Sequence, residues 1–151
     1  MGAGYIEHHG QPYGYRAGRR MPVRYLVDAS SEDIKTGNAI TVTGMSAGYV
    51  GRADGSGDRV IGFAMEDVDS PSADGEASVL VDVSTESIYE VPPDSGTLTT
   101  AELLDSCDIG ADGFSIDRDA SVTDDIQILS IDTNLNTALI KRLDVGIPGV
   151  A

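Results

Sequence analysis

Tryptophan is absent from this sequence, and the other aromatic residues are six tyrosines and two phenylalanines in 151 residues. Such side chains supply the flat apolar faces on which a sugar ring stacks, so their scarcity disfavours a glycoside hydrolase. The 25 aspartates and glutamates still allow a pair of catalytic carboxylates by number. The glycine-rich stretch "ADGSGD" lacks the lysine of a phosphate-binding loop. No pattern in the sequence therefore argues for an enzyme.

Cysteine is almost absent too, since Cys107 is the one cysteine in the chain. An intrachain disulfide and a cysteine-rich zinc site are therefore excluded. A nucleophilic cysteine needs a histidine base, but the two histidines, His8 and His9, stand far earlier in the sequence. We expect Cys107 to be a buried, inert thiol. His8 and His9 have no third ligand at a suitable spacing, so we expect no metal there and no cofactor.

Long apolar runs are missing as well. No segment approaches the roughly 18 apolar residues that span a membrane, and no apolar signal segment follows Met1. The formal net charge is −15, which repels nucleic acid and anionic lipid. We expect a soluble protein, synthesised in a cytoplasm, that binds neither nucleic acid nor membrane.

The few positive charges are concentrated at the start of the chain. Residues 1–24 contain four arginines and one glutamate, a net charge of +3, whereas the rest contains 6 basic and 24 acidic residues, a net charge of −18. Residues 1–20 include five glycines and little aliphatic periodicity, which predicts an extended arm that orders only against a partner or against its own domain. A solubilising tail is the simpler alternative.

The arm and the residues that follow it up to Arg24 combine tyrosine with arginine. These residue types are enriched where proteins contact each other most strongly. We therefore expect this segment to bind an acidic protein partner. The candidate interface residues are Tyr13, Tyr15, Arg16, Arg19, Arg20 and Arg24.

Residues 21–151 are divided by glycine and proline into short segments, many of them alternating between apolar and polar residues. The clearest is "ASVLVDV", in which Val79, Val81 and Val83 share one face. About eight short strands follow from this pattern, which favours an all-β fold, a small barrel or sandwich, in one domain. The main expected strands are 21–27, 39–43, 60–65, 77–83, 87–91, 126–132 and 137–143, with shorter ones near 49–50 and 113–117.

One short helix is expected between the strand at 87–91 and the strand near 113–117. Thr99 and Glu102 have the spacing of a capping box, and Leu103 and Leu104 supply an apolar face for about two turns.

The stretch "DIGADGFSIDRD" partly matches a calcium-binding loop, with Asp108, Asp112 and Asp119 at ligand positions. Gly110 stands at another ligand position, and polar Ser115 stands where the motif has an apolar residue. Turns made by Asp–Gly pairs explain the stretch equally well, so we expect no metal.

Several segments taken in order resemble the small decoration, or cement, proteins of tailed-bacteriophage capsids. The resemblance covers about residues 21–143 and rests on "DIKTGNAITV", "VIGFAMED", "ASVLVDV", "TTAELLDSCDIG" and "ILSIDTNLNTALIKRL". It lies in the order of elements and a few residue types, with no catalytic signature.

This resemblance implies a small β-barrel of the β-tulip type over residues 21–151, preceded by an arm over residues 1–20. It also implies a homotrimer on the outer surface of the virion, where it bridges neighbouring major capsid proteins without catalysis. The arm is longer and richer in arginine than in the plainest members, so its contact residues rest on composition alone.

Two other functions stay open at this point. A binding module of a phage head fibre or host-attachment protein would carry an aromatic or cationic cluster away from the arm. A small β-barrel hydrolase would have a pocket with two converging carboxylates.

Overall fold

A computed structural model of the chain describes residues 13–55, 57–119 and 123–144. The first twelve residues of the expected arm, which include the histidine pair, lie outside this range.

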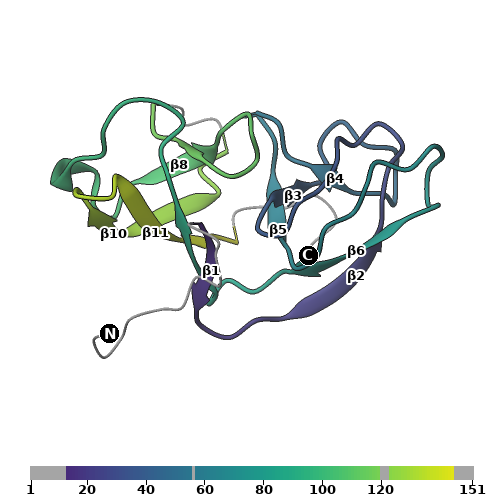
Figure 1. Cartoon of the computed structure of the whole chain (residues 1–151), viewed down its shortest axis with the longest axis horizontal. Helices are drawn as coiled ribbons and strands as arrows, with labels where there is room; N and C mark the ends of the chain where they lie inside the picture. The colour runs from purple at the N-terminus through teal and green to yellow at the C-terminus, as the bar shows by residue number, and fades with distance from the viewer. Residues whose placement is uncertain (1–12, 56, 120–122, 145–151) are drawn as a thin grey trace.

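The described residues form an all-β fold of eleven strands in two antiparallel sheets, as Figure 1 shows. The first sheet contains, in spatial order, β1 (Gly14–Ala17), β7 (Ile88–Val91), β11 (Thr137–Arg142), β10 (Ile126–Asp132), β8 (Ser106–Ile109) and β9 (Ile116–Asp117). The second contains β2 (Pro22–Leu26), β6 (Ser78–Asp82), β5 (Val60–Ala64), β3 (Ala39–Thr41) and β4 (Gly51–Arg52). The all-β prediction is confirmed.

The predicted small β-barrel of about eight short strands is not confirmed, because the strands divide between two sheets and neither sheet forms a closed barrel. Each sheet also has one parallel β-bridge between two strands that share no continuous ladder of backbone hydrogen bonds. In the second sheet the bridge links Val27, after β2, to Val50, before β4. In the first sheet it links Pro93, after β7, to Ile116 of β9. The reason lies in β5, whose five residues are all buried. A strand covered on both faces needs a core on each side, which one barrel wall facing solvent does not provide.

Two hydrophobic clusters supply those cores. One lies between the sheets and joins Phe63 of β5 to Tyr89 of β7, with ring centroids 4.2 Å apart. The other lies against the opposite face of the second sheet and contains Val79 and Val81, both fully buried, as their alternation predicts. The shared first cluster makes the two sheets parts of one packed unit.

The predicted two-turn helix is a single 3₁₀ turn, η1 (Thr100–Glu102). Its capping contact is present, with the Thr99 backbone N–H donating to Glu102 Oε1 at 2.9 Å. The turn ends at once because Leu104 adopts a left-handed conformation, φ +69°, and its N–H donates to Ile128 of β10. Leu103 and Leu104 stay exposed. In the described part of the chain, no helix is long and apolar enough to cross a membrane.

Two strands were not foreseen. β8 follows η1 directly and pairs with β10, in place of the end of the predicted helix. β1 lies within the expected arm and pairs with β7, Gly14 opposite Glu90 and Ala17 opposite Ile88, with a bulge between. The described part of the arm is therefore ordered against its own domain.

Candidate protein-binding surface

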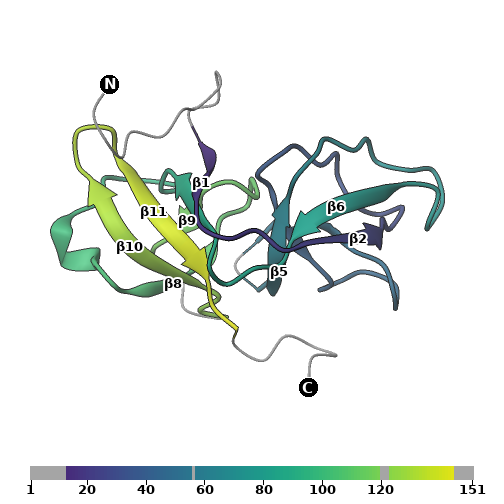
Figure 2. The ribbon, with the colours of Figure 1, turned by 90° about the horizontal axis from the view of Figure 1, so that it is seen from below.

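The connection between β1 and β2 passes from one sheet to the other, as Figure 2 shows from below. We call residues 18–21 the crossover segment. Gly18 lies so close to the β6–β7 turn that a Cβ atom would stand 2.0 Å from the Glu86 carbonyl oxygen, and its φ is +94°. Only glycine fits this position, so the path of the crossover segment is fixed by contact with that turn.

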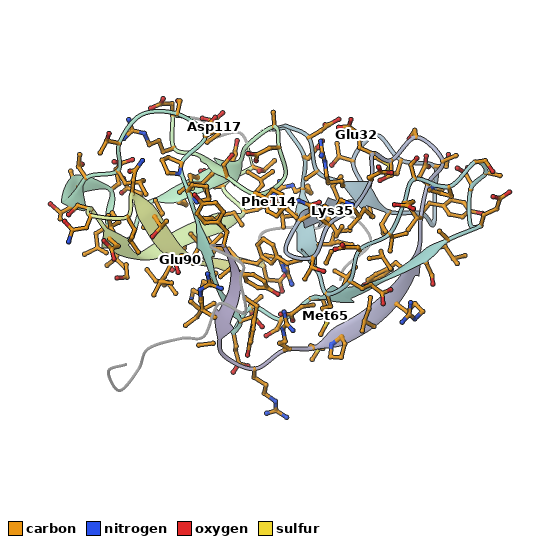
Figure 3. All side chains as sticks on the ribbon, viewed as in Figure 1. Glu32, Lys35, Met65, Glu90, Phe114 and Asp117 are labelled. Atoms are coloured by element: carbon orange, nitrogen blue, oxygen red, sulfur yellow. The ribbon has the colours of Figure 1, made fainter. Side chains whose placement is uncertain are left out.

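Arg16, a predicted interface residue, is buried with 7% of its surface exposed. Its Nε donates to Glu90 Oε1 at 3.0 Å, and the Thr137 hydroxyl donates to Glu90 Oε2 at 2.7 Å. Glu90, labelled in Figure 3, lies beside β1. Arg16 therefore anchors β1 to the sheet, and Glu90 neutralises its positive charge within the molecule.

Tyr15 and Arg20 form a stacked pair over the junction of the sheets. The Arg20 guanidinium carbon lies 3.7 Å from the centroid of the Tyr15 ring, and that ring meets Tyr89 edge-on with centroids 5.7 Å apart. Arg20 Nε lies 3.6 Å from Asp82 Oδ2, a fully buried carboxylate. Stacking and charge together hold the Arg20 guanidinium in one orientation.

Asp82 is the centre of this junction. It accepts hydrogen bonds from the Tyr89 hydroxyl at 2.7 Å and from the Met21 N–H at 2.9 Å. Burial first, and then the Asp82 carboxylate, raise the pKa of Tyr89 above its ordinary value, so the phenol stays protonated and donates. The start of β2 is thereby tied to a tyrosine of the other sheet.

The remaining predicted interface residues face outward. Tyr13 is 37% exposed, Arg19 is exposed, and the side chain of Arg24 is 53% exposed although its Nη1 donates to Glu66 Oε2 at 3.0 Å. Exposed apolar side chains stand among them, because Met21 and Leu26 are 58% and 48% exposed. We call these residues, together with the partly buried Arg20, the crossover surface: Tyr13, Arg19, Arg20, Met21, Arg24 and Leu26.

The crossover surface contains a pocket of about 270 Å³ where the crossover segment passes the β6–β7 turn. The pocket is lined by Arg19, Arg20, Met21, Ser84 and Glu86. Sequence reasoning named the two arginines but missed Ser84 and Glu86. Neither carries a local signal, since both reach the site only through the packing of the turn against Gly18.

Cys107 is buried, as predicted, with 1% of its surface exposed. Burial, followed by the nearby carboxylates of which Asp108 is the strongest, raises the pKa of its thiol to about 12. The side chain is therefore a protonated thiol within the core at neutral pH.

The residues that partly match a calcium-binding loop do not converge. Asp108 is fully buried and accepts hydrogen bonds from the N–H and hydroxyl groups of Thr123. Asp112 instead accepts from the N–H groups of Phe114 and Ser115 and closes its own turn. Within the described ranges, no group of three or more histidine, cysteine, aspartate or glutamate residues is arranged to hold a metal ion.

Comparison with known protein families found no family model that matches this chain, and comparison with curated proteins found no match either.

Proposed function

We propose that this protein is a non-catalytic capsid decoration protein, which binds the outer surface of a phage head and bridges neighbouring major capsid proteins. The observation that carries the proposal is the crossover surface, in which exposed arginines and exposed apolar side chains lie along the crossover segment and β2, an edge strand of the second sheet. The order of sequence segments over residues 21–143, which resembles that of decoration proteins, supports the same function.

Charge explains why this surface suits an acidic partner. The body of the protein is strongly negative, and repulsion opposes its approach to another acidic surface. Arg19 offsets that repulsion locally, and Arg24 has N–H groups beyond the Nη1 that contacts Glu66, so both can form hydrogen-bonded pairs with carboxylates. Met21 and Leu26 supply apolar area. The acidic remainder faces solvent and keeps decorated particles apart.

The anchoring of β1 also suits a bridging role. Arg16 and Asp82 tie the crossover segment to both sheets, so force applied to the exposed side chains passes into the packed core. On this proposal the protein is made in the host cytoplasm, assembles as a homotrimer, resides on the virion surface and needs no cofactor. It contacts the capsid protein and its own copies, and neither nucleic acid nor membrane.

The test is co-sedimentation of the purified protein with shells assembled from the major capsid protein of the phage that encodes it. We expect Arg19→Glu combined with Arg24→Glu to weaken binding at least about tenfold, because each reversal replaces attraction by repulsion at the contact. The matched control is Lys35→Glu combined with Lys141→Glu, which changes net charge equally outside the crossover surface. Equal weakening by both pairs, or no binding of the unmodified protein to shells, would overturn the proposal.

A further inference from the structure

We infer that the pocket beside the crossover segment is a receptor for one carboxylate, the side chain of an aspartate or glutamate presented by the protein partner. This inference rests on the proposed function and deepens it by naming the chemical group that the surface captures.

The two arginines supply unused donors. Within the part of the chain that the structure describes, the Arg19 side chain forms no hydrogen bond or ion pair. Arg20 Nε is buried 3.6 Å from Asp82 and out of a ligand's reach, so Arg20 offers a ligand the N–H groups of its terminal Nη atoms. A planar guanidinium offers paired N–H groups that match the two oxygens of a carboxylate.

Arg20 is already oriented before any ligand arrives. Its guanidinium is stacked on Tyr15 and drawn toward buried Asp82, so little side-chain freedom is lost when a carboxylate binds. Arg19 follows Gly18, whose position is fixed against the β6–β7 turn. The site is therefore partly preorganised by the same contacts that fix the crossover segment.

The other lining residues fit a short acidic side chain. Met21 offers an apolar wall to methylene groups. The Ser84 oxygen accepts the Glu86 N–H at 2.9 Å, which leaves the serine hydroxyl hydrogen able to donate to a ligand oxygen. A volume of about 270 Å³ exceeds what one carboxylate side chain requires, so a second contact from the partner backbone also has room.

Charge selects a carboxylate over a phosphate. The charges of Arg19 and Arg20 are formally balanced by Glu86 and by Asp82, which lies 3.6 Å from Arg20, so the pocket has no excess positive charge for a doubly charged anion. A phosphate would place more negative charge inside the pocket than one carboxylate does, and Glu86 and Asp82 would repel it more strongly. Glu86 therefore limits the affinity and disfavours a single group that carries more than one negative charge.

The experiment follows the arginine Nε–Hε signals of the full-length ¹⁵N-labelled protein by NMR at constant ionic strength. The probes are a blocked hexaglutamate peptide, a blocked hexaglutamine peptide and inorganic phosphate. We expect saturable shifts of the Arg19 and Arg20 signals with hexaglutamate, none with hexaglutamine, and weaker binding of phosphate.

Three single variants sharpen this result. Arg19→Gln is expected to weaken hexaglutamate binding at least about fivefold, and Glu86→Gln to strengthen it about threefold, because a like charge leaves the pocket. Lys35→Gln removes one positive charge outside the pocket and should leave the affinity nearly unchanged. Amide spectra of each variant report whether it is folded.

Tighter binding of phosphate than of hexaglutamate would overturn the assignment, as would equal effects of Arg19→Gln and Lys35→Gln. The outcome is separable from that of the shell experiment. Shell binding without saturable shifts at Arg19 and Arg20 would remove the pocket and retain the decoration function. Saturable shifts without shell binding would retain the carboxylate pocket and remove the decoration function.

Discussion

Asp28 shows how one side chain organises two loops. The residue is buried, and its carboxylate accepts hydrogen bonds from the Ser30 hydroxyl and N–H and from the Ser46 N–H, with donor distances of 2.6 to 2.7 Å. These bonds, led by the one from the Ser30 hydroxyl, lower the pKa of Asp28 from its ordinary value of 3.8 to about 2. The loops after β2 and β3 are thus held together by an ionised carboxylate.

The sign of the pH effect follows from that lowered pKa. Stabilisation by Asp28 is complete above pH 4 or so and is lost as the pH falls toward about 2, because the folded state must then take up a proton that the unfolded state already holds. We expect Asp28→Asn to be less stable than the unmodified protein at pH 7 and to approach it at pH 2.5. Urea unfolding at both values measures this difference, and a gap that does not change with pH would contradict the account.

At the scale of the element, the segment after η1 shows a conflict between local sequence and strand pairing. The capping spacing of Thr99 and Glu102 correctly predicts a helical turn. A longer helix would need a surface to cover Leu103 and Leu104, yet both are exposed. The residues that follow pair with β10 as strand β8 and do not continue the helix. A local sequence pattern does not show this long-range pairing. The sequence pattern did not predict β1 for a similar reason, because Arg16 is buried through its pairing with Glu90, which lies 74 positions away in the sequence.

The left-handed conformation of Leu104 makes a prediction about this element. A leucine at φ +69° costs about 1–2 kcal/mol relative to its normal conformations, and glycine removes that cost while adding some unfolded-state entropy. Because Leu104 is 60% exposed, little burial is lost. We expect Leu104→Gly to raise the free energy of unfolding by about 0.5–1 kcal/mol.

The control for this change is Leu103→Gly. Leu103 has a similar exposure of 47% but an ordinary φ of −59°, so glycine there should destabilise the protein slightly. Denaturant titrations compare the two variants directly. A loss of stability in both would show that Leu104 is not strained.

At the scale of the whole molecule, the alternating patterns located most of the strands but not their division into sheets. The hairpin of β10 and β11 and the valines of β6 follow from period-two alternation alone. The two-sheet arrangement depends on β5, which is buried on both faces, and a short apolar run does not say how many cores surround it. The pocket depends in turn on that arrangement, since its arginines and Glu86 meet only where the chain crosses between sheets.

This arrangement predicts that the two sheets unfold together. Phe63 of the second sheet is 2% exposed and packs on Tyr89 of the first, and Asp125, just before β10, receives the Val60 N–H at 2.7 Å and pairs with Arg59 at 3.0 Å. Phe63→Ala should therefore lower the free energy of unfolding by about 3–5 kcal/mol. The loss should appear equally in amide hydrogen exchange of β10 and of β6, although β10 belongs to the other sheet.

Val79→Ala is the matched comparison, because Val79 is fully buried in the cluster that belongs to the second sheet alone. If the sheets form one cooperative unit, both substitutions reduce protection in both sheets and heating gives one calorimetric transition. Independent sheets would give two transitions, with Val79→Ala affecting only the second sheet. In that case the junction at Asp82 and Tyr89 would not transmit load, and the bridging role proposed for the crossover segment would lose its physical basis.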